Sequence, residues 1–358
     1  MNIKARVFLT LVALCLNVFL FPVMCQSQDN VDFPNDSDNE PFLSDYDDDA
    51  AGENYYTDYS GEEYPVDYEE DGSDYVSEEQ PVVEQRPPQL APGAPIKLEE
   101  KSIRLGRIPY RSLKEMMAQA VPLLRLLQKK TGAKEVRFVS SGKDYASILD
   151  SLARGNIDFA WIGPTAYLNR RDLDKLMPVA KAKFGSETAY RGVFIAPAKG
   201  KVQGLEDIKG CKIGFVDRES TSGYIYPLYL LLQLGINPHK DSTVYFMKNH
   251  DNVLRAVLAG KLDAGVCLEN TLNSLKDKSL LNKIIVLGKT NEIPSDVIVC
   301  RQDCPINLRE RFLEALTQIK AGELPGPPLT FMPAFDEEFE SVNAIMCFID
   351  SLKNKTKK

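Results

Sequence analysis

Residues Lys212–Asn237 read KIGFVDRESTSGYIYPLYLLLQLGIN, and they predict a strand, a loop and a helix in that order. Residues 212–216 alternate and then become apolar, as a strand does on entering a core. After a polar connection, Ser220–Gly223 precedes an apolar run that stops at Gly235, in the position where a helix commonly ends. Three hydroxyl groups and a glycine therefore stand at the start of the helix.

Such a helix start suits a small anion. The first backbone N–H groups of a helix have no partners within the helix, and the dipole places about half a positive charge beside them. Ser220, Thr221 and Ser222 add hydroxyl donors, and Gly223 lets the backbone approach a ligand closely. The alternative is ordinary N-capping, but one Ser or Thr would serve that purpose. The cluster therefore favours an anion-binding loop.

The N-terminus has the features of a secretory signal peptide over residues 1–25. Two basic residues precede an apolar run over residues 7–21, and Val23 with Cys25 permits cleavage before Gln26. The run is short for a membrane-spanning helix, so a retained anchor is the weaker interpretation. A lipid-modified Cys25 is a further alternative, which the bulky Met24 disfavours. We expect a secreted protein, or a periplasmic one if the host is bacterial.

Residues 26–97 form an acidic, tyrosine-rich segment that ends in a proline-rich linker. Between Gln26 and Gln85 there are 21 acidic residues and no basic residue, a composition that predicts disorder. The tyrosines beside acids are typical of tyrosine-sulfation sites, with an unmodified solubilising tail as the alternative: Tyr46, Tyr55, Tyr56, Tyr59, Tyr64, Tyr68 and Tyr75. Such a tail would attract cations, mineral or a basic partner. Asn35 and Asn354 begin short N-glycosylation motifs.

The net charge of −8 conceals two regions of opposite sign. Of the 43 Lys and Arg residues only two precede Arg86, so from Arg86 onward 41 basic residues face 30 acidic ones. A basic region attracts anions over about a Debye length. The absence of a nucleic-acid-binding motif, together with secretion, argues against nucleic acid as a partner.

The chain from residue 98 onward is long enough for two lobes, each with its own core. Strand patterns alternate with helical ones, which predicts parallel βαβ units and the α/β class. The expected strands are 103–108, 136–139, 159–162, 193–196, 212–216, 264–267, 284–287 and 297–300, and the expected helices are 113–131, 146–154, 224–234, 253–259 and 308–321. Ligands in such sheets bind beyond the carboxyl ends of strands, where Ser220–Gly223 would lie.

Five cysteines follow the signal peptide, and in an oxidising compartment we expect some to pair: Cys211, Cys267, Cys300, Cys304 and Cys347. Because five is odd, at least one stays free or pairs with another chain, and Cys300 and Cys304 are close enough to close a small loop. Their spacing without nearby histidines is not typical of a metal site. An enzyme is not expected, because the only histidines are His239 and His250, and no GxSxG motif frames Ser222.

Residues 215–238 follow the pattern FVDxxSTSGYxxPLxxLLxxGINP, which resembles the phosphonate and phosphate-ester substrate-binding proteins of bacterial ABC transporters. The resemblance extends over residues 103–348 and includes DFAWIGP at 158–164 and IPSD at 293–296. It implies the type 2 periplasmic-binding-protein fold, with two lobes, a hinge and a cleft between the lobes. We then expect 98–197 with 289–352 as the first lobe, 198–288 as the second lobe, and 353–358 as a basic C-terminal tail.

The resemblance also implies roles for residues outside the loop. A Tyr in a D-Y motif and a second Tyr near the hinge would face the ligand, a His before a helix would meet its oxygens, and an acid would hold an amine or an acidic P–OH. Where the family often has an acid or Asn, this chain offers two candidates at 269 and 270. The predicted ligand-binding residues are Tyr145, Tyr190, Ser220, Thr221, Ser222, Gly223, His250, Glu269, Asn270 and Asp296. No cofactor or metal is expected.

Two functions follow from these patterns. The first is a secreted solute-binding protein that closes on a small phosphorus oxyanion (phosphate, a phosphate ester or a phosphonate), with a membrane transporter as an open question. The second is an extracellular matrix or mineral-associated protein that reuses the scaffold together with its acidic tail. A binder of another small metabolite on the same fold is a third interpretation.

Overall fold

Strands and helices alternate along the chain in the computed structural model, which describes residues 96–140, 144–275 and 277–355. The strands are β1 (Ser102–Arg107), β2 (Glu135–Val139), β3 (Phe159–Ile162), β4 (Leu176–Phe184), β5 (Ala189–Tyr190), β6 (Gly192–Pro197), β7 (Lys212–Phe215), β8 (Thr243–Phe246), β9 (Ala264–Leu268), β10 (Ile284–Lys289), β11 (Ile293–Pro294), β12 (Val297–Arg301) and β13 (Leu329–Pro333). The helices are α2 (Leu113–Thr131), α3 (Tyr145–Ala153), α4 (Pro164–Arg171), α5 (Tyr226–Gln233), α6 (Pro238–Asp241), α7 (His250–Leu258), α8 (Glu269–Asn273), α9 (Ile306–Thr317) and α10 (Glu340–Lys355). Short helical turns are η1 (Leu98–Glu100), η2 (Leu205–Ile208), η3 (Thr221–Ile225), η4 (Lys278–Lys283) and η5 (Asp336–Phe339).

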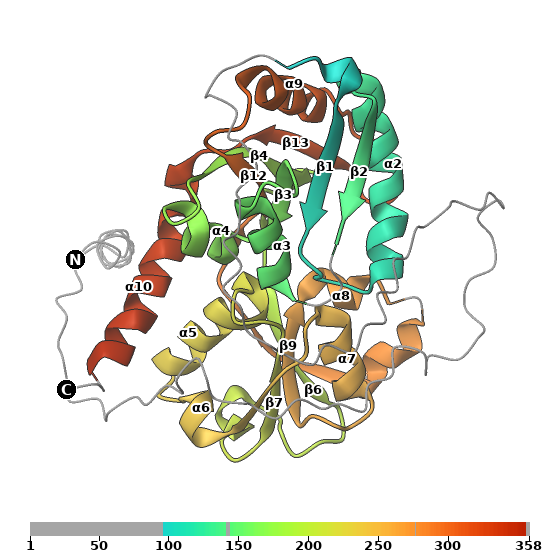
Figure 1. The fold of residues 1–358 in the computed structure, drawn as a ribbon. Helices are drawn as coiled ribbons and strands as arrows, with labels where there is room; N and C mark the ends of the chain where they lie inside the picture. Colours follow the sequence, from blue (N-terminus) through green and yellow to red (C-terminus); the bar gives the residue numbers. More distant parts are fainter. Residues whose placement is uncertain (1–95, 141–143, 276, 356–358) are drawn as a thin grey trace, which may run out of the picture.

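Two β-sheets divide these elements into a first and a second lobe (Figure 1). The sheet of the first lobe has the order β13-β4-β12-β3-β1-β2, and the sheet of the second lobe has the order β10-β6-β9-β7-β8. The small ladder of β5 with β11 lies in the two connections that pass between the lobes. The predicted α/β, two-lobed architecture is therefore confirmed.

Both sheets are mixed, which corrects the expectation of parallel units throughout. Strands β1, β2 and β3 are parallel, as are β7, β8 and β9. Strands β12, β4 and β13 run antiparallel to their neighbours, as do β6 and β10. The reason lies in the connections, because β6 and β12 enter their sheets directly from the other lobe rather than through a crossover helix.

Apolar side chains fix the helices on their sheets. In the first lobe, α2 ends at Gly132, whose φ of 72° favours glycine, and it buries Leu123 and Leu127 against the strands. The rings of Phe159 on β3 and Phe312 on α9 stack with centroids 3.9 Å apart. These contacts leave the carboxyl ends of β1 and β3 facing the second lobe (Figure 1).

The lobe boundaries differ from those expected at three places. Residues 192–197 form β6, which pairs with β9 and β10, so they belong to the second lobe rather than the first. Helix α10 extends to Lys355, so the expected tail at 353–358 begins within a helix. The same helix buries Val342 and Ile349 in the core of the second lobe, although its chain neighbours lie in the first (Figure 1). The patterns above also do not predict β4, β8, β13, α4 or α10.

Several expectations lie outside the described residues, namely the signal peptide at 1–25, nearly all of the acidic segment at 26–97 and the sulfation sites within it. All five cysteines after residue 25 are described, and all are free thiols, so the expected disulfide is not present in the structure. Of the helices within the described ranges, none combines the length and the apolar character needed to cross a bilayer.

Candidate functional site

The loop Ser220–Gly223 lies at the carboxyl end of β7, as the sequence predicts. The Ser220 hydroxyl accepts a hydrogen bond from the Gly223 N–H at 3.0 Å, which is an ordinary helix cap. The turn that follows is wide, because the N–H groups of Ile225 and Tyr226 donate to carbonyls five residues earlier. Such wide turns recur at functional sites. Helix α5 therefore begins two residues later than its apolar run suggests.

Gly223 is required by this turn. A Cβ atom there would lie 2.4 Å from Val216 Cγ2 and 2.7 Å from Ser220 Oγ. Both distances are shorter than van der Waals contact allows. The absence of a side chain thus lets β7 and the helix start pack together and keeps the hydroxyl loop in place.

The first lobe covers this loop with a second helix start. Ser220, Thr221 and Ser222 are each only 2–3% exposed. The Thr165 N–H, at the start of α4, donates to Thr221 Oγ1 at 3.0 Å. The preceding Gly163 makes room, since a Cβ there would lie 3.3 Å from Thr221 Oγ1. Two helix N-termini, one from each lobe, therefore converge on Thr221.

Tyr190 and Asp296 are brought to the same point by the ladder of β5 with β11. The Tyr190 hydroxyl donates to Asp296 Oδ1 at 2.9 Å and is also within hydrogen-bonding reach of Thr221. Burial, and then the neighbouring carboxylate, raise the pKa of Tyr190 well above its usual value. Burial also raises the pKa of Asp296, although the Arg107 charge and the Tyr190 hydroxyl oppose the increase.

Tyr145, at the start of α3, reaches the loop from the other side. It is 2% exposed, and its hydroxyl is within hydrogen-bonding reach of Ser220. Its backbone N–H lies close to the Asp217 carboxylate, which belongs to the second lobe. Burial raises the pKa of the Tyr145 hydroxyl well above its usual value, so the phenol keeps its proton and stays a donor.

We define the cleft cluster as the residues that these contacts link: Tyr145, Thr165, Tyr190, Ser220, Thr221 and Asp296. Thr165 is not predicted from the sequence. Its Oγ1 is buried and, within the described residues, has no hydrogen-bond partner. A buried hydroxyl without a partner costs free energy, and a ligand oxygen in the cleft would relieve that cost.

His250 lies at the start of α7 and is 3% exposed. Its Nδ1 accepts a hydrogen bond from the Leu268 N–H at 2.9 Å, which assigns the proton of the neutral ring to Nε2. Burial lowers the pKa of His250 to about 4, even though Asp251 opposes the decrease. His250 is therefore a neutral donor at physiological pH and not the cation that a protonated imidazole would supply.

Glu269 and Asn270 do not join the cleft cluster. The Glu269 carboxylate pairs with the Lys289 ammonium, and the Asn270 side chain is exposed to solvent. Within the described residues, neither side chain has a hydrogen bond or an ion pair with a member of the cluster. Of the ten residues predicted to bind ligand, five are members of the cleft cluster, and Ser222 and Gly223 lie in the same loop as Ser220 and Thr221. His250 lies at the start of α7, and Glu269 and Asn270 lie at the start of α8.

An ion pair holds the lobes together beside His250. Arg111, which precedes α2 in the first lobe, donates from Nη2 to Asp251 Oδ1 of the second lobe at 3.0 Å. The Ser112 N–H donates to Asp251 Oδ2 at 3.0 Å, and the His250 N–H donates to the Tyr110 carbonyl at 3.1 Å. Both charged side chains are largely buried. The structure is therefore a closed form, with contacts between the lobes on both sides of the cleft.

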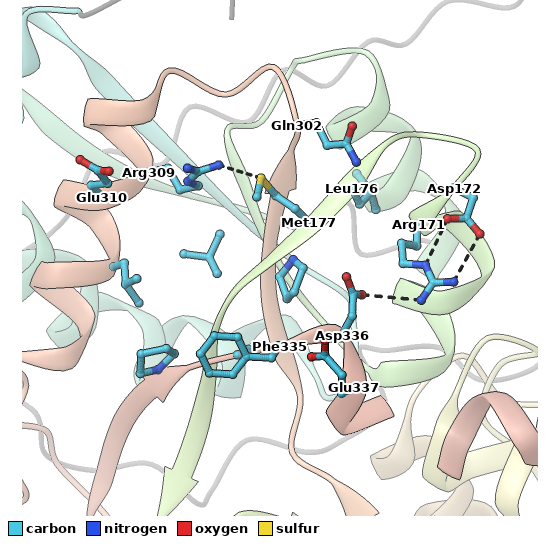
Figure 2. Close-up of a pocket in the computed structure, with 15 residues that line it drawn as sticks. Arg171, Asp172, Leu176, Met177, Gln302, Arg309, Glu310, Phe335, Asp336 and Glu337 are labelled. Carbon is cyan, nitrogen blue, oxygen red and sulfur yellow. Dashed lines mark hydrogen bonds and ion pairs between the residues drawn. The ribbon is translucent and has the colours of Figure 1, made fainter. Parts of the chain in front are cut away.

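A separate hollow of about 790 Å3 lies on the outside of the first lobe (Figure 2). Figure 2 shows that its arginines already have partners: Arg171 pairs with Asp172 and Asp336, and Arg309 donates to the Met177 sulfur. Acidic side chains outnumber basic ones on its walls. This hollow does not suit an anion, in contrast to the cleft cluster.

Metal binding finds no support in the described residues, where no group of three or more His, Cys, Asp or Glu side chains could hold an ion. The donors in the cleft are hydroxyls, phenols and N–H groups, which suit an anion. The fold and this enclosed site define a two-lobed substrate-binding protein.

Comparison with known proteins identifies the family. The family described as "ABC transporter, phosphonate, periplasmic substrate-binding protein" matches residues 105–330, and the chain belongs to it. Members of this family are substrate-binding proteins and not enzymes. The chain is 32% identical over 195 residues to the phosphate-import protein PhnD of Mycolicibacterium smegmatis, covering 51% of this chain and 59% of that protein. The chain spans about three fifths of the length of the curated relatives that it matches.

Solved structures show the same fold. A binding protein component of an ABC phosphonate transporter from Pseudomonas aeruginosa is 22% identical, with a TM-score of 0.66 over 72% of this chain and 88% of that one. PhnD1 of Prochlorococcus marinus, solved in complex with methylphosphonate, is 18% identical, with a TM-score of 0.61 over 70% of this chain and 98% of that one. At these identities the likeness concerns the fold alone.

Proposed function

We propose that this protein is a solute-binding protein whose lobes close on a small phosphorus oxyanion, namely phosphate, a phosphate ester or a phosphonate. The observation that carries the proposal is the buried hydroxyl loop Ser220–Ser222, which meets the start of α4 and two buried phenols from the first lobe. Tetrahedral oxyanions accept several hydrogen bonds at once, and this arrangement offers donors from both lobes.

The geometry favours a small ligand. Members of the cleft cluster already touch one another across the cleft, so a ligand that binds among them must be compact. A hydrogen bond to a charged group contributes roughly 1.5–3 kcal/mol, so three or four such bonds near the upper end of that range reach the roughly 8 kcal/mol of a micromolar complex. Those bonds exist only when the lobes meet, which couples binding to hinge closure.

The names of two relatives agree with this ligand class, since one imports phosphate and another was solved with methylphosphonate. We also infer that binding takes place outside the cytoplasm, with a membrane transporter as the partner that receives the ligand. Nothing in the described residues favours the matrix or mineral-associated alternative, so a role for the acidic tail is not part of this proposal.

The test is calorimetric titration of the full chain with inorganic phosphate, methylphosphonate and 2-aminoethylphosphonate. We expect saturable binding of at least one of them and its loss in the double variant Thr221→Ala with Ser222→Ala. Ser242→Ala with Thr243→Ala removes two hydroxyls of the same lobe away from the cleft and should bind as the wild type does. Unchanged affinity in the Thr221 and Ser222 variant, with the fold retained, would sink the proposal.

A further inference from the structure

Arg107 is the last residue of β1 and lies beside the cleft cluster, although sequence patterns give it no role. It pairs in register with Trp161 on the neighbouring strand β3. Its guanidinium carbon lies 3.7 Å from the centroid of the Trp161 ring and 4.2 Å from that of the Tyr110 ring. Two aromatic rings therefore fix the position of this cation.

The hydrogen-bonding capacity of Arg107 is not used inside the protein. Within the described residues, its side chain has no hydrogen bond and no ion pair, and its contacts are the two rings. The guanidinium carries five N–H donors in its plane, and stacking on rings leaves its edges open to an acceptor. A half-buried cation in this position is available to bind an anion.

Arg107 also faces the acid of the cleft cluster. Asp296 directly precedes β12, two residues before Ile298, and Ile298 is in register with Trp161. The Asp296 carbonyl accepts from the Ala182 N–H, so the pairing of β12 with β4 continues at Asp296. Arg107, Trp161 and Asp296 thus project to the same face of the sheet. The Arg107 charge acts on Asp296 without forming an ion pair with it.

We propose that Arg107 determines ligand specificity by supplying a fixed positive charge beside the cleft cluster, which selects phosphorus oxyanions that carry no ammonium group. This inference rests on the proposed function and narrows its ligand class to inorganic phosphate and to phosphonates with neutral or acidic substituents. The charges of Arg107 and Asp296 compensate each other, so Asp296 exerts little net attraction on an amine. An ammonium group near Arg107 is repelled instead, in a half-buried place where water screens charges weakly.

The role expected for Asp296 changes accordingly. Its Oδ1 already accepts the Tyr190 proton, and burial favours its protonated form. An acid whose Oδ1 already has a partner, and whose charge burial opposes, is a weak partner for an amine. The remaining donors of the second lobe, the hydroxyls of the loop and His250, are neutral and contribute no such discrimination.

The experiment compares two probes of similar size, methylphosphonate and 2-aminoethylphosphonate, by titration of the full chain. We expect the wild type to bind methylphosphonate at least tenfold more tightly than 2-aminoethylphosphonate. Arg107→Gln should weaken methylphosphonate binding about tenfold and bring the ratio of the two dissociation constants close to one. Arg107→Lys, which keeps the charge, should retain most of the preference. Arg137→Gln removes an exposed arginine of the neighbouring strand and should leave both constants unchanged.

The outcomes separate this inference from the proposed function. A wild type that binds none of the phosphorus oxyanions overturns the proposed function. A wild type that binds, with the same ratio in Arg107→Gln, overturns the role of Arg107. If Arg107→Gln fails to fold, Arg107→Lys decides: a retained preference supports the proposal, and a lost preference in a folded protein contradicts it.

Discussion

The two halves of the cleft use different chemistry. The second lobe contributes the hydroxyls of Ser220–Ser222 and a neutral His250, all buried and all without charge. The first lobe contributes Asp296, with the Arg107 cation close by and buried phenols around them. Neutral hydrogen-bond donors can bind any small oxyanion of suitable size. Fixed charges in the site distinguish between ligands by the charge that each ligand carries. We therefore propose that the second lobe mainly provides affinity and that the first lobe mainly provides selectivity.

The largest effect is expected from a substitution that displaces the hydroxyl loop of the second lobe. Gly223→Ala places a Cβ against Val216 and Ser220, so the loop must move. We expect the free energy of unfolding to fall by about 1–3 kcal/mol, as overpacking commonly costs. Affinity should fall at least about a hundredfold, because two or more hydrogen bonds of about 1.5–3 kcal/mol each are lost.

Denaturation and calorimetry of the full chain measure both effects. Gly288→Ala is the matched control, since its Cβ would meet only the end of the flexible Leu205 side chain, at 3.1 Å. That variant should keep its affinity. Normal ligand binding by Gly223→Ala would show that the second half does not depend on this turn.

The next prediction tests whether His250, in the second lobe, is neutral in the folded protein. In the unfolded chain, His250 binds a proton when the pH falls below its ordinary pKa of 6.5. In the folded protein it stays neutral down to about pH 4. The unfolded state therefore binds more protons in this window, and the free energy of unfolding falls as the pH decreases. A difference of one in pKa corresponds to about 1.4 kcal/mol, so wild type should lose about 2 kcal/mol more than His250→Gln between pH 7 and pH 5.

Urea denaturation of both proteins at the two pH values provides the measurement. Burial raises the pKa of Glu115 and of Glu219 to about 7, but both groups titrate in wild type and variant alike and cancel in the difference. An equal loss in both proteins would mean that the folded imidazole carries a proton, and the second half would then hold a charge.

The same contrast explains how much of the site could be predicted from the sequence. The second half is contiguous: Ser220–Gly223 follows a strand and starts a helix, so a local pattern reveals it. The first half is assembled from the ends of β1, β5 and α3 and from residues around Gly163 and Asp296, which lie far apart in the chain. Only a family resemblance pointed to Tyr145, Tyr190 and Asp296.

Other parts of the structure gave no local signal at all. Arg107 is an ordinary charge at a strand end until the fold places two rings around it. Glu269 looks like a ligand by position, but the pairing with Lys289 depends on a strand that is distant in the sequence. The fold class follows from periodicity, whereas antiparallel β6 and β12 follow from the route of the chain through the hinge, which periodicity does not encode.

A smaller effect on affinity is expected when the Arg111–Asp251 ion pair between the lobes is broken. Asp251→Asn keeps the shape of the side chain but removes the charge that binds Arg111. The closed form should become less populated, and apparent affinity falls in proportion to that population. We expect about a tenfold increase in the dissociation constant and a larger radius of gyration by X-ray scattering without ligand. Glu292→Gln breaks the exposed Arg191 pair at the hinge and should change little, so an equal effect of both variants would contradict a specific role of Asp251.

The smallest effect is expected at Glu269, which the sequence predicts to bind ligand and which the structure pairs with Lys289. Glu269→Gln removes the partner of Lys289, and both side chains of this pair are substantially exposed. Exposed ion pairs contribute roughly 0–1 kcal/mol, so stability should change little. Because Glu269 does not touch the cleft cluster, affinity for methylphosphonate and for 2-aminoethylphosphonate should each change less than about twofold. A selective loss of 2-aminoethylphosphonate binding in Glu269→Gln would instead place an amine-binding acid in the second lobe and reverse the division of roles between the halves.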